Sequence, residues 1–181
     1  MEIISESDQQ AAVDALRAFL DAEIEPIVVQ YRDQFIPKEQ MLAIVRRLTD
    51  FGLVVAPFPK SEGGWEMDWE VHMRLFEEVC YTSSDIGLAL SINAIGGSLL
   101  MKAPDHIREK YLPRVLSGDA LLSVCISEPG VGSDVSSVKV RARRDGDHYV
   151  INGEKTWITN GDYSDFLVVT ALTGEGENAG L

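Results

Sequence analysis

Two stretches of this sequence combine residue types that can bind a ligand, and the first is CISEPGVGSD, residues 125–134. Gly130 and Gly132 allow positive φ and a close approach of the backbone. Ser127, Ser133 and the N–H groups of the turn offer several hydrogen-bond donors, which together can hold a phosphate or a ring carbonyl. The alternative is a wide turn between two strands. The glycine spacing matches neither a P-loop nor a dinucleotide-binding fingerprint.

The second stretch is INGEKTWITNG, residues 151–161. Trp157 and Thr159 are separated by one residue, so on a strand both side chains point to the same face of the sheet. An indole beside a hydroxyl can flank an aromatic heterocycle and hydrogen-bond to its edge. The alternative is an aromatic cross-strand pair on a sheet, with Thr159 as an ordinary strand residue.

The first of these stretches follows a long segment in which apolar residues recur at helical spacing, which predicts an all-helical N-terminal part. Ser7 or Asp8 and then Asp68 are available as N-caps, and Gly52 as a stop signal. The irregular connection 53–65 contains two prolines and a Gly pair. Five helices are expected, over 7–35 with a kink near Pro26, 37–51, 68–80, 85–101 and 104–116.

The helix expected over 85–101 contains several small residues, namely Gly87, Ala89, Ser91, Ala94 and Gly96. Glycine in a helix costs about 1 kcal/mol relative to alanine and usually has a packing reason. We therefore expect close contact between this helix and its neighbours rather than a ligand-binding role for the small residues themselves.

From residue 120 the hydrophobic pattern changes to that of β-strands. Strands are expected over 120–127, 137–145, 148–151, 155–158 and 165–172, with turns at the Asp-Gly-Asp and Asn-Gly sequences between them. The predicted fold class is α+β, an all-α helical bundle over 1–118 followed by a partial antiparallel β-barrel over 119–181. The polar tail TGEGENAGL ends without a closing element, as if a further segment followed.

Composition excludes some classes of partner. The formal net charge of −13, from 16 Lys and Arg against 29 Asp and Glu, argues against binding to nucleic acid. Cys80 and Cys125 lie far apart without a metal-binding pattern, so no disulfide framework or zinc site is expected, and a reducing cytoplasm fits best. We expect no targeting segment and no membrane span within this sequence.

Taken together, the motifs resemble those of the acyl-CoA dehydrogenase family of flavoproteins. The resemblance covers all 181 residues and is carried by FPKSEGGW, REKYLPRVLSGD, SEPGVGSD and DGDHYVINGEKTWITNG. It implies bound FAD, with the flavin lined by the first strand, the following loop and the segment around Trp157. The flavin-lining positions are Val124, Cys125, Ile126, Ser127, Ser133, Trp157, Ile158 and Thr159.

The resemblance further implies that the Ser127 hydroxyl hydrogen-bonds to the flavin ring and that the Thr159 hydroxyl lies near its reactive N5 edge. Ser133 also matches a position that contacts the acyl-CoA ligand. The remaining loop residues, Glu128, Pro129, Gly130, Gly132 and Asp134, are expected to shape the loop, with Asp134 as a turn acceptor.

No residue of this sequence is assigned as the catalytic base. In the family a glutamate takes the α-proton of the thioester, and the resemblance implies that it comes from a C-terminal helical domain that this sequence lacks. Glu77 and Glu78 are expected on a solvated or salt-bridged helix face, and His72, His106 and His148 as surface or packing residues. A truncated form is favoured over a natural half that pairs with a separate chain and over a decayed paralogue.

The activity implied is the α,β-dehydrogenation of an acyl-CoA thioester, with a hydride passing to FAD N5 and electrons leaving to an electron-transfer flavoprotein or another acceptor. The isolated chain is expected to be inactive, and the complete protein to be a homo-oligomer such as a homotetramer. The alternatives are a non-catalytic assembly subunit that pairs with a complete partner, and a related flavin monooxygenase or nitroalkane oxidase on the same fold.

The acyl group and its carrier, CoA or acyl carrier protein, stay open. Selectivity is expected to depend partly on the helix around Leu90, Ile92, Ala94 and Ile95, and we expect at least one of Ile92 and Ile95 to line the pocket.

Overall fold

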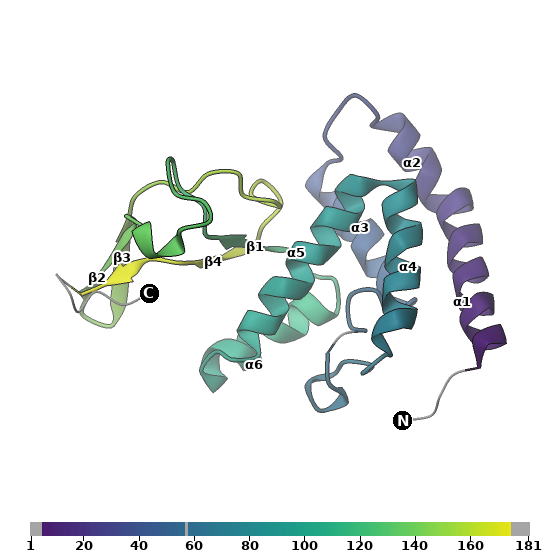
Figure 1. Cartoon of the computed structure of the whole chain (residues 1–181), viewed down its shortest axis with the longest axis horizontal. Coiled ribbons are helices and arrows are strands. Elements are labelled where there is room, and N and C mark those ends of the chain that lie inside the picture. The colour runs from purple at the N-terminus through teal and green to yellow at the C-terminus, as the bar shows by residue number, and fades with distance from the viewer. Residues whose placement is uncertain (1–4, 57, 175–181) are drawn as a thin grey trace.

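The computed structural model describes residues 5–56 and 58–174 and begins with a long interrupted helix (Figure 1). It consists of α1 (Glu6–Phe19), a π-helical turn (Leu20–Ile24) and α2 (Glu25–Gln30). The N-cap is Ser5, whose hydroxyl accepts a hydrogen bond from the Asp8 N–H, and not Ser7 or Asp8 as expected. Near the expected kink the helix forms this π turn, which ends at Ile24, two residues before Pro26, and Pro26 has no N–H to continue the helical ladder.

The other four helices lie close to their expected positions. They are α3 (Lys38–Thr49), α4 (Trp69–Thr82), α5 (Ser84–Leu100) and α6 (Asp105–Leu116). Asp68 caps α4 as expected, since its carboxylate accepts from the Glu70 N–H at 2.9 Å. Gly118, with φ of +72°, follows the end of α6. A short 3-10 turn (Lys60–Glu62) lies in the irregular connection before α4.

The small residues of α5 allow close packing, as expected. A Cβ on Gly87 would lie 2.5 Å from Cys80 Sγ of α4, and a Cβ on Gly96 would lie 1.7 Å from Leu122 Cδ1. Helix α5 is therefore in contact with α4 on one side and with the first strand on the other. The main core lies among α1, α3, α4 and α5, and its members include Leu16, Leu20, Ile44, Leu48, Val79, Ile86 and Leu121.

The strands are β1 (Leu122–Cys125), β2 (Arg141–Asp145), β3 (His148–Asn152), β4 (Phe166–Val169) and β5 (Leu172–Thr173). Helices followed by a partial, unclosed sheet region confirm the predicted fold class. The expected direction of pairing is right only for β2 and β3, because β1 pairs with β4 in parallel and β2 pairs with β5 in parallel. Parallel partners need a long crossover connection, and residues 126–165 separate β1 from β4.

Three expected strand segments differ in the structure. Residues 155–158 form no strand, because Trp157 adopts left-handed φ of +59°. The segment expected over 165–172 is divided into β4 and β5 at Thr170. The Thr170 N–H donates to Cys125 O at 3.1 Å, and the following strand β5 pairs with β2 instead. Residues 135–137 form a 3-10 turn, so β2 starts later than expected.

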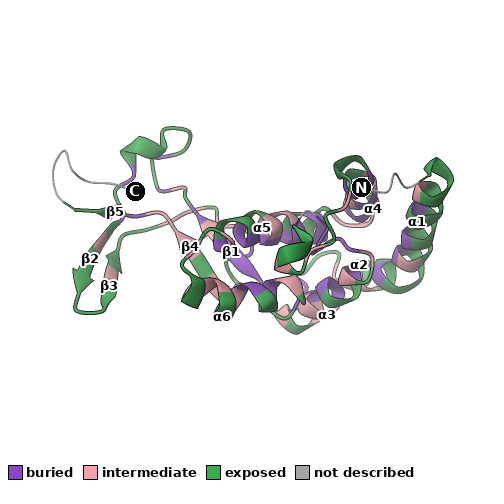
Figure 2. Ribbon diagram, turned by 90° about the horizontal axis from the view of Figure 1, so that it is seen from below, coloured by how far each residue is buried: buried purple, intermediate pink, exposed green. Residues whose placement is uncertain are grey.

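The helices lie at one end of the molecule and β2, β3 and β5 at the other, with β1 and β4 next to α5 and α6 (Figure 1). Burial is concentrated in the helices and β1, whereas β2 and β3 are mostly exposed (Figure 2). None of the described helices is long and apolar enough to cross a membrane. Most of the expected open tail, 175–181, lies outside the described residues.

Candidate functional site

The loop after β1 is built on a tight turn at residues 128–131. The Glu128 N–H donates to Val131 O at 3.1 Å and the Val131 N–H donates to Glu128 O at 3.0 Å. Pro129 stands at the second position of this turn, and Gly130 has φ of +83° at the third, which is the arrangement of a type II turn. The turn chemistry of the sequence therefore gives the loop its backbone shape.

The Glu128 side chain fixes this loop to the chain that leads into β2. Its carboxylate is only 3% exposed and accepts hydrogen bonds from the Lys139 N–H at 2.7 Å and the Val140 N–H at 3.0 Å. Burial alone would raise the pKa of Glu128, but these bonds and the Lys155 ammonium group outweigh it and lower the pKa to about 2. Glu128 is thus a structural carboxylate, in agreement with its expected role in shaping the loop.

Lys155 connects three segments at one point. Its Nζ donates to Ile126 O at 2.8 Å, to Glu128 Oε1 at 2.9 Å and to Thr170 Oγ1 at 2.9 Å. The neighbouring Thr156 N–H donates to Ser127 O at 2.9 Å. The two stretches that the sequence singled out, 125–134 and 151–161, therefore lie side by side and are hydrogen-bonded to each other. The sequence analysis did not identify Lys155, and nothing in the residues around it indicates these three contacts.

Asp134 closes the far end of the loop. Its carboxylate accepts from the Ser136 N–H at 3.2 Å and from the hydroxyls of Ser136 and Ser137, and these hydroxyl bonds lower the pKa of Asp134. The carboxylate thus caps the 3-10 turn Val135–Ser137. This confirms the prediction that Asp134 is a turn acceptor.

Trp157 and Thr159 do not occupy the same strand, which corrects the prediction that a strand aligns them. Thr159 belongs to a turn, and Asn160 after it has left-handed φ of +63°, a conformation that interrupts a strand but that asparagine tolerates. The Trp157 side chain is nevertheless 93% exposed. A large indole in that position is available to a ligand or to another part of a larger protein.

The turn after Trp157 is held by residues that the sequence analysis did not single out. Asn160 Nδ2 donates to Ala89 O of α5 at 3.0 Å and to Leu122 O of β1 at 3.3 Å. Ser123 Oγ donates to Thr159 O at 2.7 Å. The Asn-Gly dipeptide at 160–161 was a signal for this turn, but it contained no indication that Asn160 would contact the helices.

Hydroxyl groups without protein partners gather near these two segments. Within residues 5–56 and 58–174, the side chains of Ser127, Ser133 and Thr159 make no hydrogen bond, and the buried Thr156 Oγ1 has no partner. Exposed Ile126 and Trp157 supply apolar surface beside them. The buried Thr156 hydroxyl lacks a partner, and the two segments also supply accessible hydroxyls and an exposed indole, so the residues present fit a flat ring with a polar edge such as an isoalloxazine.

The remaining predicted flavin-lining residues differ in accessibility. Val124 and Ile158 are half-buried, and Cys125 is buried. Burial raises the pKa of the Cys125 thiol, and the Lys155 charge opposes that shift. Ser133 is exposed, and no hydrogen bond within the described chain ties it to the other predicted site residues.

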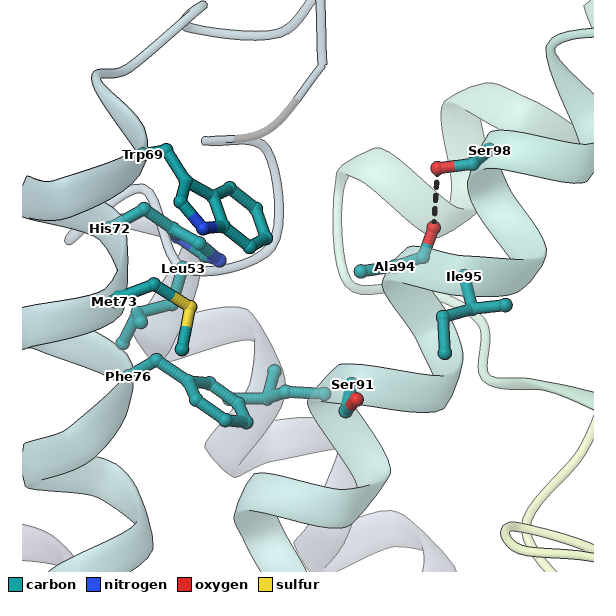
Figure 3. Close-up of a pocket in the computed structure, with 10 residues that line it drawn as sticks. Leu53, Trp69, His72, Met73, Phe76, Ser91, Ala94, Ile95 and Ser98 are labelled. Carbon is teal, nitrogen blue, oxygen red and sulfur yellow. Dashed lines mark hydrogen bonds between the residues drawn. The ribbon is translucent and has the colours of Figure 1, made fainter.

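A groove of about 360 Å³ lies between α4 and α5 (Figure 3). Ile95 lines this groove and Ile92 does not. The groove is mainly apolar, and its lining consists of Leu53, Trp69, His72, Met73, Phe76, Leu90, Ser91, Ala94, Ile95 and Ser98.

The other titratable candidates lie where the sequence analysis expected them. Glu78 pairs with Arg17 at 2.6 Å, and Glu77, His106 and His148 are exposed. Both cysteines are free thiols. The described part of the chain contains no cluster of His, Cys, Asp or Glu that could hold a metal ion.

Comparison with known proteins gives two matching family models. Residues 6–119 match the model described as "Acyl-CoA dehydrogenase, N-terminal domain", and residues 123–181 match "Acyl-CoA dehydrogenase, middle domain".

Individual relatives agree with these matches. The chain is 36% identical over 161 residues to a 3-(aryl)acrylate reductase of Clostridium sporogenes, covering 87% of this chain and 41% of the relative. It is 32% identical over 168 residues to the mitochondrial isovaleryl-CoA dehydrogenase of Bos taurus, and the match covers 92% of this chain and 39% of the relative. A crystal structure of an acyl-CoA dehydrogenase complexed with FAD from Bacillus anthracis aligns with a TM-score of 0.80 at 26% identity. The alignment covers 93% of this chain and 30% of that one. The chain thus spans about two fifths of the length of the curated relatives it matches.

Proposed function

Because this chain belongs to the acyl-CoA dehydrogenase family, we propose that it forms part of the FAD and thioester site of an enzyme that dehydrogenates an acyl-CoA between its α and β carbons. The observation that carries the proposal is the contact between the two candidate segments. Thr156 N–H donates to Ser127 O, and Lys155 joins the backbone of one segment to the side chain of the other. Unpartnered hydroxyls and the exposed Trp157 indole accompany that contact.

We assign the flavin to a set of residues from these segments and from β1. Trp157 and Ile126 would pack against the ring, and the hydroxyls of Ser127 and Thr159 would hydrogen-bond to its edge. Cys125 is buried and would contribute its main chain. The full proposed set is Val124, Cys125, Ile126, Ser127, Ser133, Trp157, Ile158 and Thr159, and Ser133 would also contact the acyl-CoA.

When bound, FAD supplies the hydride-accepting redox chemistry. The protein's own contribution here is placement and polarity, because fixed donors such as the Ser127 and Thr159 hydroxyls stabilise negative charge that builds on a ring edge. The Lys155 and Glu128 pair holds the loop in shape without taking part in proton transfer, since both side chains are engaged with each other.

The α-proton of the thioester requires a base. Glu128 is ion-paired and Glu78 is bound to Arg17, so neither is free to act. We propose that a glutamate outside these 181 residues takes the proton, and that the chain alone is inactive. We further propose the division at residues 118–119 as the boundary between two domains.

The groove between α4 and α5 is the proposed place for the tail of the acyl group. Its apolar lining suits a hydrocarbon or aryl tail, and its volume lies at the lower end of the range for small-molecule pockets. The relatives include an isovaleryl-CoA dehydrogenase and a 3-(aryl)acrylate reductase, so we take the class of the tail from the lining of this groove.

The partners follow from the reaction. We propose an electron-transfer flavoprotein or similar acceptor, and a homo-oligomer such as a homotetramer for the complete protein. Free Cys80 and Cys125 support a cytoplasmic location.

The test is a visible absorption spectrum of the purified chain after addition of FAD and desalting, followed by anaerobic addition of saturated acyl-CoAs. Retained flavin that is not bleached is the expected result, because the site residues are present and the base is not. Bleaching would contradict the absence of a base. Loss of all flavin on desalting would contradict the proposed flavin site in this chain.

The same protein tests the oxidase alternative. The flavin-loaded chain is given a nitroalkane or another oxidase substrate, and oxygen consumption is measured. Consumption of oxygen would support the oxidase alternative and contradict the dehydrogenase proposal. We expect none, since the relatives named above include a dehydrogenase of branched acyl-CoA and a reductase of arylacrylate.

A further inference from the structure

His72 is a buried polar side chain in the apolar groove between α4 and α5. The residue is only 7% exposed, and its Nδ1 is buried without a hydrogen-bond partner among the described residues. Its ring extends from α4 into the groove toward α5 (Figure 3). A polar group that is buried without a partner lowers stability, so its presence calls for a group that can pair with it.

The chemical state of His72 defines what can pair with it. Burial lowers the pKa of His72, which leaves the ring neutral at neutral pH. A neutral imidazole carries one donor and one acceptor nitrogen. A hydroxyl or similar oxygen group on a ligand could satisfy either one, whereas a hydrocarbon tail could satisfy neither.

The walls of the groove define the shape of the ligand. On α4, the His72 ring lies between Trp69, at 5.4 Å between centroids, and Phe76, at 6.3 Å. On α5, the facing wall combines the large side chains Leu90 and Ile95 with smaller ones such as Ser91. A row of rings along one wall, with apolar side chains on the other, favours an aromatic group that packs against the rings.

We propose that His72 determines specificity by selecting an aromatic acyl tail that carries an oxygen substituent. The tail would lie flat against Trp69 and Phe76, and its oxygen would hydrogen-bond to His72. This inference rests on the proposed function, because it assigns the groove to the acyl tail.

The test uses 4-ethylphenol and ethylbenzene, which differ by one hydroxyl group and contain no thioester. Dissociation constants for the 181-residue chain are measured from NMR shifts of the Ala94 and Ile95 methyl groups. We expect 4-ethylphenol to bind about fivefold more tightly, which is the usual effect of one neutral hydrogen bond. His72→Phe keeps a ring and removes both nitrogens, so it should abolish the preference.

The matched control is His106→Phe. His106 is exposed on α6 and does not line the groove, so the same change of residue type there should leave the preference intact. A second measurement needs no variant: the imidazole ¹⁵N resonances of His72 should shift with 4-ethylphenol and stay unchanged with ethylbenzene.

Equal affinity for the two probes, no binding of either, or a preference that persists in His72→Phe would overturn the inference. FAD retention by the same protein separates the two proposals. If the chain retains FAD but binds both probes equally, only the proposed role of His72 is refuted. If the chain prefers 4-ethylphenol but does not retain FAD, the groove is still supported as a ligand site and the proposed flavin site is refuted.

Discussion

Lys155 Nζ lies 2.9 Å from Oε1 of Glu128, and both side chains are almost fully buried at the junction of the two candidate segments. The ammonium group also donates to Ile126 O and Thr170 Oγ1, while the carboxylate accepts two backbone N–H groups. The charges therefore compensate each other and leave no hydrogen-bonding group of the carboxylate exposed. This pair holds the loop whose backbone would face the flavin.

We expect Lys155→Met to destabilise the chain strongly, because it leaves the Glu128 carboxylate buried without its cation. The loss should exceed that of Arg108→Met, which breaks ion pairs with Asp105 and Glu62 near the surface and should cost about 1 kcal/mol or less. Urea unfolding followed by circular dichroism measures both. The double variant Lys155→Met/Glu128→Gln should recover part of the loss, and equal effects of the two single variants would contradict a structural role for the pair.

The pH dependence of stability should report the depressed pKa of Glu128. Between about pH 4.5, the ordinary value, and pH 2, the folded value, the unfolded chain binds more protons than the folded chain at this residue. The stabilisation is therefore complete above pH 4.5 and is lost as the pH falls toward 2. Glu128→Gln should flatten this part of the curve in urea titrations.

Asp119, Asp134 and Asp147 also have lowered pKa values, so the comparison must isolate Glu128. Asp134→Asn serves as the control, since it removes an exposed turn acceptor and leaves Glu128 in place. If Glu128→Gln and wild type lose stability in parallel over this range, the Glu128 assignment is wrong.

Gly96→Ala should weaken the contact between α5 and β1. The added Cβ would lie 1.7 Å from Leu122 Cδ1, so the helix and strand must separate or Leu122 must change rotamer. Overpacking of this kind costs roughly 1–3 kcal/mol. Gly132→Ala is the matched control because no atom lies within 4 Å of its added Cβ. Thermal unfolding should show a loss for the first variant only.

Asn160→Ala should destabilise the turn after Trp157 and reduce FAD retention with it. The change removes hydrogen bonds to Ala89 O and Leu122 O and leaves alanine at φ of +63°. The expected cost is about 1–3 kcal/mol. Asn160→Gly keeps the backbone conformation accessible and should cost less, and a reversed order in chemical denaturation would disprove the account based on left-handed geometry.

Trp157→Ala should reduce the affinity for FAD without changing the unfolding midpoint, because the side chain is 93% exposed. Loss of one aromatic contact of about 0.5–1.5 kcal/mol corresponds to roughly two- to tenfold weaker binding. Flavin fluorescence titration measures the affinity. Tyr149→Ala, which removes an exposed aromatic ring from β3, should leave it unchanged. Unchanged affinity in Trp157→Ala would remove Trp157 from the proposed site.

The local features of this protein could be predicted from its sequence. The helices between Lys38 and Leu116, the cap at Asp68 and the turn at Pro129 and Gly130 all depend on residues close together in the chain. Each arises from short-range effects such as side-chain periodicity, capping and allowed φ. The family membership was recognised in the same way, from motifs read along the chain.

Contacts between distant residues were decided only by the tertiary structure. Nothing in the local pattern of Lys155 or Asn160 indicates that one pairs with Glu128 or that the other anchors a turn to α5. The same holds for the parallel pairing of β1 with β4 and for the groove that encloses His72. These arrangements arise when buried polar groups must find partners and helices must pack, and both conditions depend on the whole fold rather than on any one segment.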